Sequence, residues 1–209
     1  MSVPKNFKIF FFQGGASTQF SAVPYNLLRG KDKANYFTTG AWSQGAIAEA
    51  KKLCTAVEVW PGSNNIFNTL PDVGKWNIDK DAAYFHYCAN ETIHGVEFQE
   101  FPYEAIGDLT LVCDMSSNFC SRPINWDKYG VVYGGAQKNI GPAGATITVI
   151  REDLIGHQRK DTPLICDWHT FDKAPNTFHN TPVCWSIYVC GLNIAHMKKN
   201  GLAYYQDLA

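Results

Sequence analysis

One lysine and one aspartate are the residues of this sequence best placed to do chemistry. Lys138 follows the apolar run 131–133 and the small residues 134–136, and a glycine-rich turn at 141–144 comes after it. Asp114 ends another apolar run upstream. A lysine amine can form an imine with a carbonyl compound, and small neighbours let a flat ligand lie close to the backbone. A carboxylate nearby can keep a ring nitrogen protonated.

The elements that must position this pair are two strands. The apolar runs 109–113 and 131–133 predict buried strands, and the β-branched residues of 145–150 predict a third. Because open α/β sheets bind ligands where strands end, Asp114 and Lys138 can face one crevice. Pyridoxal phosphate is a cofactor that needs both an amine and an acid. The alternative is that Lys138 is an ordinary solvated loop lysine.

A glycine turn near the N-terminus indicates an anion site. The aromatic run 6–12 predicts a strand, Gly14 and Gly15 follow it, and apolar residues at helical spacing come next. A strand, a glycine turn and a helix together offer free backbone N–H groups and a positive helix end to a phosphate. Many strand–helix connections contain such a turn, so the turn alone is not specific. It indicates a phosphate site only together with the strands that carry Asp114 and Lys138.

Two further side chains could contact a cofactor ring. Trp42 lies at the start of a helix predicted over 41–53, where it could pack in the core or offer a flat surface for stacking. Thr92 follows a predicted strand at 83–88. Its hydroxyl could bind a phenolic oxygen or simply cap a turn.

The C-terminal third contains a long apolar helix. It is predicted to begin at Thr181, as the N-cap, with Pro182 in the first turn, and to run to about Lys199. Its apolar residues are more numerous than a surface helix needs. Shorter elements are predicted at 96–101, as a half-exposed strand, and at 151–156, as a helix.

Composition limits the class of protein. The 209 residues are 45% hydrophobic and 18% charged, with a net charge of -1, as in a globular protein of one large domain. This balance argues against nucleic-acid and membrane partners. The seven cysteines form no CxxC motif and indicate free thiols in a reducing compartment, which we interpret as the cytoplasm. The six histidines show no metal-ligand spacing, so no metal site is expected.

Six stretches together resemble one protein family. They are FFQGGASTQFSAVPYNLL, TTGAWSQGAIAEAKKL, YCANETIHGVEF, VCDMSSNFCSRPI, YGGAQKNIGPAG and HNTPVCWSIY. In this order, and over nearly the whole chain, they are similar to the phosphoserine aminotransferases, which are pyridoxal-phosphate transaminases of fold type I. Six ordered blocks are far more specific than any single lysine or glycine turn.

The resemblance implies a fold and an organisation. The expected fold class is α/β, a mostly parallel sheet flanked by helices, corresponding to the large domain of fold type I. Residues 1–199 would form this domain, and 200–209 would begin a small C-terminal domain. The family is longer at both ends, so this chain is expected to lack part of the substrate channel and the arginine that binds the substrate carboxylate.

The resemblance also implies a reaction and a set of roles. An amino group would pass between glutamate and 3-phosphohydroxypyruvate, giving 2-oxoglutarate and O-phosphoserine, in a homodimer with shared cofactor sites. Lys138 would carry the cofactor and shuttle a proton, and Asp114 would hold the ring nitrogen. Many relatives have an arginine where this chain has Ser17. The implied cofactor contacts are Ala16, Ser17 and Gln137 for phosphate, Trp42 for stacking, Thr92 and Ser116 for ring oxygens and phosphate, and Asn180 and Thr181 from the second subunit.

Two other functions fit part of the pattern. A different pyridoxal enzyme of the same fold, such as a cysteine desulfurase, would share Asp114 and Lys138, but it would need a nucleophilic cysteine on a mobile loop, and none stands out. A non-catalytic relic that binds the cofactor, or only dimerises, would explain the missing segments. Conversion of the bound cofactor by glutamate would distinguish an enzyme from a binder.

Overall fold

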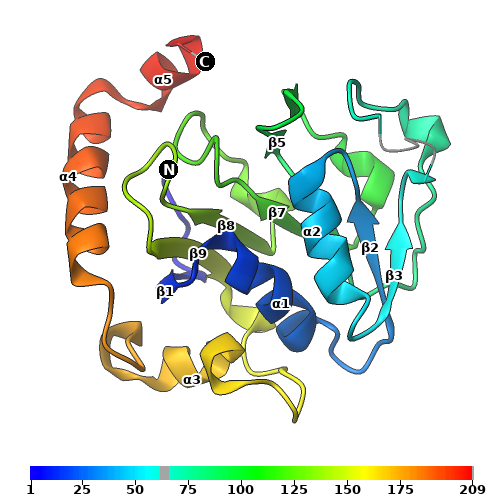
Figure 1. The fold of residues 1–209 in the computed structure, drawn as a ribbon, viewed down its shortest axis with the longest axis horizontal. Helices are drawn as coiled ribbons and strands as arrows, with labels where there is room; N and C mark the ends of the chain where they lie inside the picture. The colour runs from blue at the N-terminus through cyan, green and yellow to red at the C-terminus, as the bar shows by residue number, and fades with distance from the viewer. Residues whose placement is uncertain (62–65, 209) are drawn as a thin grey trace.

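The computed structural model describes residues 1–61 and 66–208, and a seven-stranded sheet forms its centre (Figure 1). The strand order across the sheet is β1-β9-β8-β7-β4-β2-β3. The strands are β1 (Phe7–Gln13), β2 (Lys33–Phe37), β3 (Thr55–Glu58), β4 (Tyr84–Cys88), β7 (Thr110–Asp114), β8 (Val131–Gly135) and β9 (Ala145–Arg151).

The sheet is mostly parallel. β3, β2, β4, β7 and β8 pair in parallel, whereas β9 runs antiparallel to both of its neighbours, β8 and β1. The parallel register pairs Asp114 with Cys88 on one side and with Tyr133 on the other. The expected fold class, a mostly parallel sheet flanked by helices, is therefore confirmed, and the ends of β4, β7 and β8 lie together.

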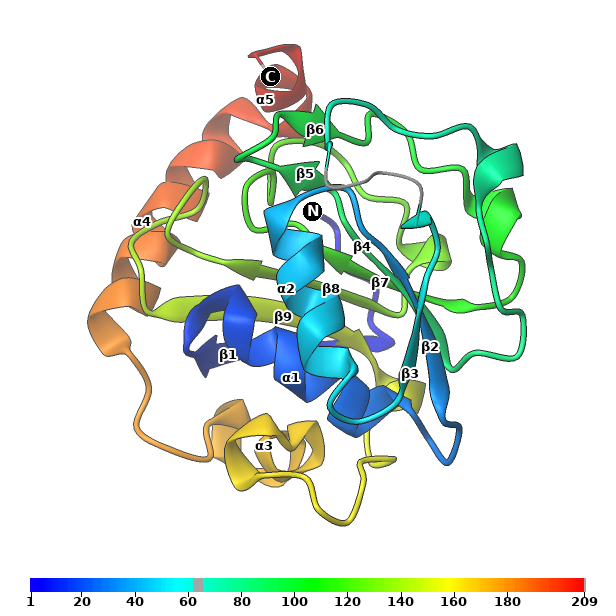
Figure 2. The same ribbon diagram turned by 45° about the vertical axis from the view of Figure 1, so that its right-hand side comes forward.

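Both faces of the sheet are buried, which explains the continuous apolar runs. Successive residues of β7 alternate between two clusters: Leu111 and Cys113 pack on one face and Val112 on the other. The Val112 face is covered by α1 (Gly15–Leu27), α2 (Ala41–Ala50) and α3 (Trp168–Lys173), as Figure 2 shows. Trp168 of α3 is fully buried there.

The opposite face is covered mainly by loops and short elements. Its aromatic residues include Phe98, Phe101 and Trp126. A small hairpin of β5 (Asn90–Glu91) and β6 (Val96–Glu97) lies beyond the end of β4. The remaining short elements are the 3-10 turns η2 (Val73–Lys75), η3 (Tyr103–Ile106), η4 (Trp126–Lys128), η5 (Glu152–Leu154), η6 (Leu164–Cys166) and η7 (Pro175–Thr177).

The last two helices extend along one side of the molecule (Figure 1). They are α4 (Cys184–Asn200) and α5 (Leu202–Leu208). α4 packs against the loop after β8, because Ser186 donates a hydrogen bond to the Ala143 carbonyl at 2.7 Å and Asn193 donates one to the Asn139 carbonyl at 3.0 Å. Among the described residues, no helix combines the length and apolar character needed to cross a membrane.

Three local expectations were wrong. Thr181 does not cap the long helix: α4 begins at Cys184, its N-cap is Val183, and no side chain supplies a capping bond. The expected strand at 96–101 is ordered as a strand only over β6, because the aromatic side chains after it leave the ladder to fill the core. The expected helix at 151–156 is the single 3-10 turn η5. The polar, turn-rich composition of 61–81 predicts a surface excursion; within it, 62–65 lie outside the described residues.

Candidate active site

A cavity of about 340 Å³ lies where β4, β7 and β8 end. Ligands bind at this position in open parallel sheets. The cavity collects side chains from segments far apart in the sequence, and within the described lining Lys138 is the only cationic residue. The lining residues are Gly14, Gly15, Ala16, Ser17, Phe20, Trp42, Cys88, Asn90, Asp114, Ser116, Ser117, Gln137, Lys138, Ala143 and Gly144.

Asp114 supplies a buried carboxyl group to the cavity. The residue is only 3% exposed, and its Oδ1 accepts hydrogen bonds from the Ser116 backbone N–H at 2.9 Å and the Ser116 hydroxyl at 2.6 Å. Ser116 Oγ also accepts a bond from the Gly135 N–H at 3.0 Å, which ties the carboxyl to the next strand. Burial raises the pKa of Asp114 to about 6, although the bonds from Ser116 act in the opposite direction. The group can therefore stabilise a positive charge placed beside it.

Lys138 stands at the mouth of the cavity. Its Nζ donates a hydrogen bond to Thr92 Oγ1 at 2.6 Å and lies 5.0 Å from the centroid of the Trp42 ring. The Trp42 indole Nε1 donates to the same Thr92 oxygen at 3.0 Å. These three residues, which are widely separated in the sequence, thus form one connected group. An amine and a flat aromatic surface are presented side by side.

The N-terminus of α1 provides the anion-binding part of the site. Gly14 and Gly15 have φ angles of 93° and 73°, a conformation that favours glycine, and a Cβ on Gly14 would clash with Thr18 Oγ1. No side chain caps this helix, so the first-turn N–H groups near Ala16 and Ser17 are free to meet an anion. Since the described part of the lining contains no arginine, a phosphate here would depend on these N–H groups.

The structure brings most of the predicted site residues together. Gln137 lines the cavity, whereas Thr92 reaches the site through its bonds to Lys138 and Trp42. Asn180 and Thr181 do not line it. The Thr181 carbonyl instead accepts a 2.5 Å hydrogen bond from the side chain of Gln13, which holds this segment beside the start of α1.

Sequence reasoning missed several residues around the site. Cys88, Asn90 and Ser117 line the cavity, and burial raises the pKa of the Cys88 thiol, so this cysteine is not a poised nucleophile. Glu91 is fully buried and touches α2. For Asn90 and Glu91 the sequence signal is the polar run 90–92 at a strand end, in which Thr92 is the residue with a predicted role.

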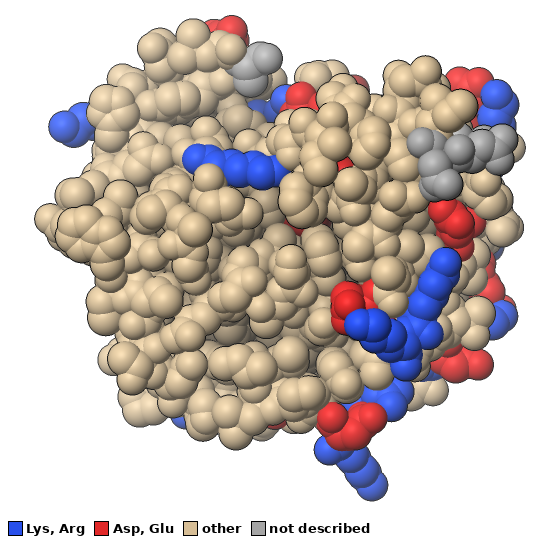
Figure 3. Space-filling model, viewed as in Figure 1, with Lys and Arg blue, Asp and Glu red and all other residues tan. Residues whose placement is uncertain are grey.

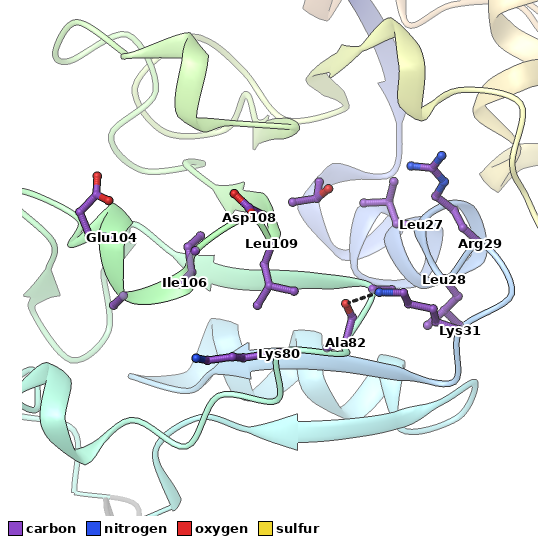
Figure 4. A pocket seen from close by; sticks show the side chains of 14 residues that line it. Leu27, Leu28, Arg29, Lys31, Lys80, Ala82, Glu104, Ile106, Asp108 and Leu109 are labelled. Carbon is purple, nitrogen blue, oxygen red and sulfur yellow. Dashed lines mark hydrogen bonds between the residues drawn. The ribbon is translucent and has the colours of Figure 1, made fainter.

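A larger cavity, of about 770 Å³, lies at the other end of the strands (Figure 4). Its wall includes Ala82, just before β4, Thr110, at the start of β7, and the end of α1. The charged side chains labelled around it, among them Lys80 and Asp108, are exposed, and Lys31 donates to the Ala82 carbonyl at 3.1 Å. Because none of the described residues in its wall is a buried ionisable one, we assign the chemistry to the smaller cavity.

Comparison with known proteins identifies similar sequences. Phosphoserine aminotransferase 2 (chloroplastic) of Arabidopsis thaliana is 44% identical over 201 residues, which is 96% of this chain and 47% of the relative. The phosphoserine aminotransferase of Drosophila melanogaster is 46% identical over 201 residues, covering 96% of this chain and 54% of the relative. The chain thus spans about half the length of these relatives.

Solved structures share the fold. Phosphoserine aminotransferase from Bacillus circulans subsp. alkalophilus superposes with a TM-score of 0.91 at 37% identity, covering 98% of this chain and 56% of that one. The pyridoxal-phosphate-bound enzyme from Trichomonas vaginalis gives 0.90 at 39% identity, covering 99% and 58%. The family profile Aminotransferase class-V matches residues 1–208. This chain therefore belongs to the class-V aminotransferase family.

Proposed function

We propose that this chain forms the cofactor-binding part of a phosphoserine aminotransferase that uses pyridoxal phosphate. The reaction would transfer an amino group between glutamate and 3-phosphohydroxypyruvate, giving 2-oxoglutarate and O-phosphoserine. The observation that carries the proposal is the convergence of three features on one cavity: the Lys138 amine, the buried Asp114 carboxyl and the uncapped start of α1. The similarity to phosphoserine aminotransferases at 44–46% identity supports the choice of substrates.

The residues of the cavity fit this cofactor. When bound, pyridoxal phosphate supplies an aldehyde that condenses with amines and a pyridinium ring that accepts electrons. The α1 N–H groups and Gln137 would bind its phosphate. Trp42 would cover one face of the ring, and the Thr92 hydroxyl would bind a ring oxygen.

Two residues would handle the protons. The Asp114 carboxylate would hold a proton on the ring nitrogen, because the positive charge of that group offsets the cost of burying the aspartate. Lys138 Nζ would carry the cofactor and then move a proton at the substrate carbon. Ser116 orients the carboxyl through its two hydrogen bonds and keeps its Oδ1 directed away from solvent.

Mixing the loaded protein with glutamate tests this function. We expect the absorbance of the bound cofactor to change as 2-oxoglutarate appears, and O-phosphoserine to form when 3-phosphohydroxypyruvate is added. Chromatography of the products against a protein-free mixture measures both steps. Stable cofactor binding with no 2-oxoglutarate would contradict the enzymatic proposal and favour the alternative of a non-catalytic binder.

We further propose that the chain forms a homodimer through α4. Trp185, Tyr188 and Leu192 are 73%, 59% and 54% exposed and share one side of this helix. Such a stripe is unusual for a solvent-facing helix. In Figure 3 the region over α1 and α4 carries few charged side chains, whereas charges gather toward β2 and β3. Residues 180–181 precede this helix and would contact the phosphate of the second subunit.

Two charges placed on this stripe should separate the subunits. We expect the parent chain to sediment as a dimer, and the double variant Trp185→Asp/Leu192→Asp to sediment as a monomer. The variant should still unfold in a cooperative thermal transition, since both side chains are largely exposed and the core of the subunit is untouched. Lys198→Ala/Lys199→Ala, at the end of the same helix, serves as the control. A parent chain that is monomeric at every concentration tested would refute the assignment.

The cysteines support a reducing compartment. All seven are free, and five of them are buried. On this ground we propose a cytoplasmic location. Two plant relatives are named as chloroplastic, and free thiols are also compatible with a reducing organelle.

A further inference from the structure

A fully buried carboxylate lies behind the candidate site. Glu91, in β5, is 0% exposed and contacts the first turn of α2. Its Oε2 accepts a hydrogen bond from the Trp42 N–H at 3.0 Å. Its Oε1 accepts one from the Ser43 N–H at 2.8 Å and one from the Ser43 hydroxyl at 2.5 Å. A charge buried to this degree needs several partners, and here they are all on one helix.

The hydrogen bonds to Glu91 take the place of the capping side chain that the N-cap residue of α2 lacks. Its N-cap residue is Gly40, which has no side chain to offer. The Glu91 carboxylate lies directly against this residue, because a Cβ on Gly40 would come within 2.5 Å of Glu91 Cδ. His94 completes the arrangement, since its Nδ1 accepts from the Ala41 N–H at 3.4 Å. The hairpin segment 91–94 thus caps a helix that is remote in the sequence, and a negative charge at this end is favourable.

The same segment holds Trp42 at two points. Glu91 accepts from its backbone N–H, and Thr92 accepts from its indole Nε1 at 3.0 Å. The Thr92 oxygen also accepts from Lys138 Nζ. If the backbone of Trp42 moved, the indole would therefore leave both Thr92 and the cavity wall.

We propose that Glu91 is a positioning residue that fixes the Trp42 indole against the cavity by capping α2. It does not touch the cavity itself, in contrast to its neighbours Asn90 and Thr92, which line it or bond to Lys138. This inference rests on the proposed function for its effect on pyridoxal phosphate, but its effect on Trp42 is independent of any cofactor.

Glu91→Gln is the sharpest substitution, because it keeps the size of the side chain. The new amide has one acceptor oxygen, and its NH₂ group must face either the Trp42 N–H or the Ser43 N–H, so one first-turn donor loses its partner. Glu49→Gln is the matched control: Glu49 is also on α2, but its carboxylate bonds to Ser21 and Lys52 and lies outside the cavity.

The first measurement uses the cofactor-free chain and the NMR signals of its indole N–H groups. Trp42→Ala identifies the Trp42 signal by its disappearance. Glu91→Gln should shift and broaden this signal and leave those of the buried Trp126 and Trp168 unchanged, whereas Glu49→Gln should move none of them. Gly40→Ala, which pushes on the Glu91 carboxylate, should reproduce the shift if Glu91→Gln folds poorly. An unmoved Trp42 signal in both variants would overturn the proposal.

The second measurement is a double-mutant cycle on the affinity for pyridoxal phosphate. Glu91→Gln should weaken binding about tenfold, the size of one hydrogen bond to a charged group. In the Trp42→Ala background the same substitution should change affinity very little, because the surface that it positions is gone. Equal losses in both backgrounds would show that Glu91 acts by another route and would refute the positioning role. If the parent chain does not bind pyridoxal phosphate, the proposed function fails while the NMR result still decides the role of Glu91.

Discussion

Lys138→Ala should abolish covalent attachment of pyridoxal phosphate. In the parent chain, borohydride reduction followed by peptide mapping should place the pyridoxyl group on the peptide that contains Lys138. The variant should carry no such label, and its turnover should fall by about 10³-fold or more, because it loses both the attachment point and the group that moves the proton. The expectation follows from the cavity, in which Lys138 is the only amine among the described lining residues.

Lys128→Ala is the control for this experiment. Lys128 is near Lys138 in the sequence, but its Nζ lies 3.4 Å from Glu104 Oε1 and 5.7 Å from the centroid of the Tyr103 ring, away from the cavity. Its loss should leave labelling and cofactor absorbance unchanged. A label on Lys128, or retained labelling in Lys138→Ala, would end our interpretation of the site.

The central pair could be predicted because local patterns are strong where the sheet is buried. Asp114 and Lys138 follow apolar, β-branched runs, and such runs indicate strands whatever their neighbours are. The runs alone do not show that the two strands are neighbours. In the structure β7 pairs with β8, with Asp114 opposite Tyr133, and this pairing brings the two strand ends to one cavity.

Other features depend on tertiary contacts and could not be predicted locally. Glu91 lies in a polar stretch typical of a surface turn, and only its contact with α2 explains why it is buried. Thr181 has the residue type and spacing of an N-cap. Its carbonyl instead binds Gln13, and α4 begins only at Cys184, so a long-range bond outweighs the local preference.

Asp114→Asn should stabilise the cofactor-free protein at neutral pH and disable the loaded one. Burial raises the pKa of Asp114 from its ordinary 3.8 to about 6, so the folded state binds the proton more tightly than the unfolded state. As the pH rises from about 4 to 6, the parent therefore loses stability, by up to about 3 kcal/mol for a shift of about two units. An asparagine carries no charge, and its oxygen can keep both bonds from Ser116, which end on Oδ1.

Two measurements check the substitution. The free energies of unfolding of the cofactor-free parent and variant should agree near pH 4 and diverge above pH 6, with the variant more stable. Equal values at pH 7.5 would mean that Asp114 is not buried as a charge.

In the cofactor-loaded chains the parent should be the better of the two, as judged by activity. Without a negative charge beside it, the ring nitrogen gives up its proton more readily, and turnover of glutamate should fall by about 100-fold or more. Ser117→Ala, on the same cavity wall but without a bond to Asp114, should change neither property strongly. The Asp114 carboxylate would thus destabilise the cofactor-free protein and be required once the cofactor is bound. Such a combination is expected of a residue whose role is chemical and not structural.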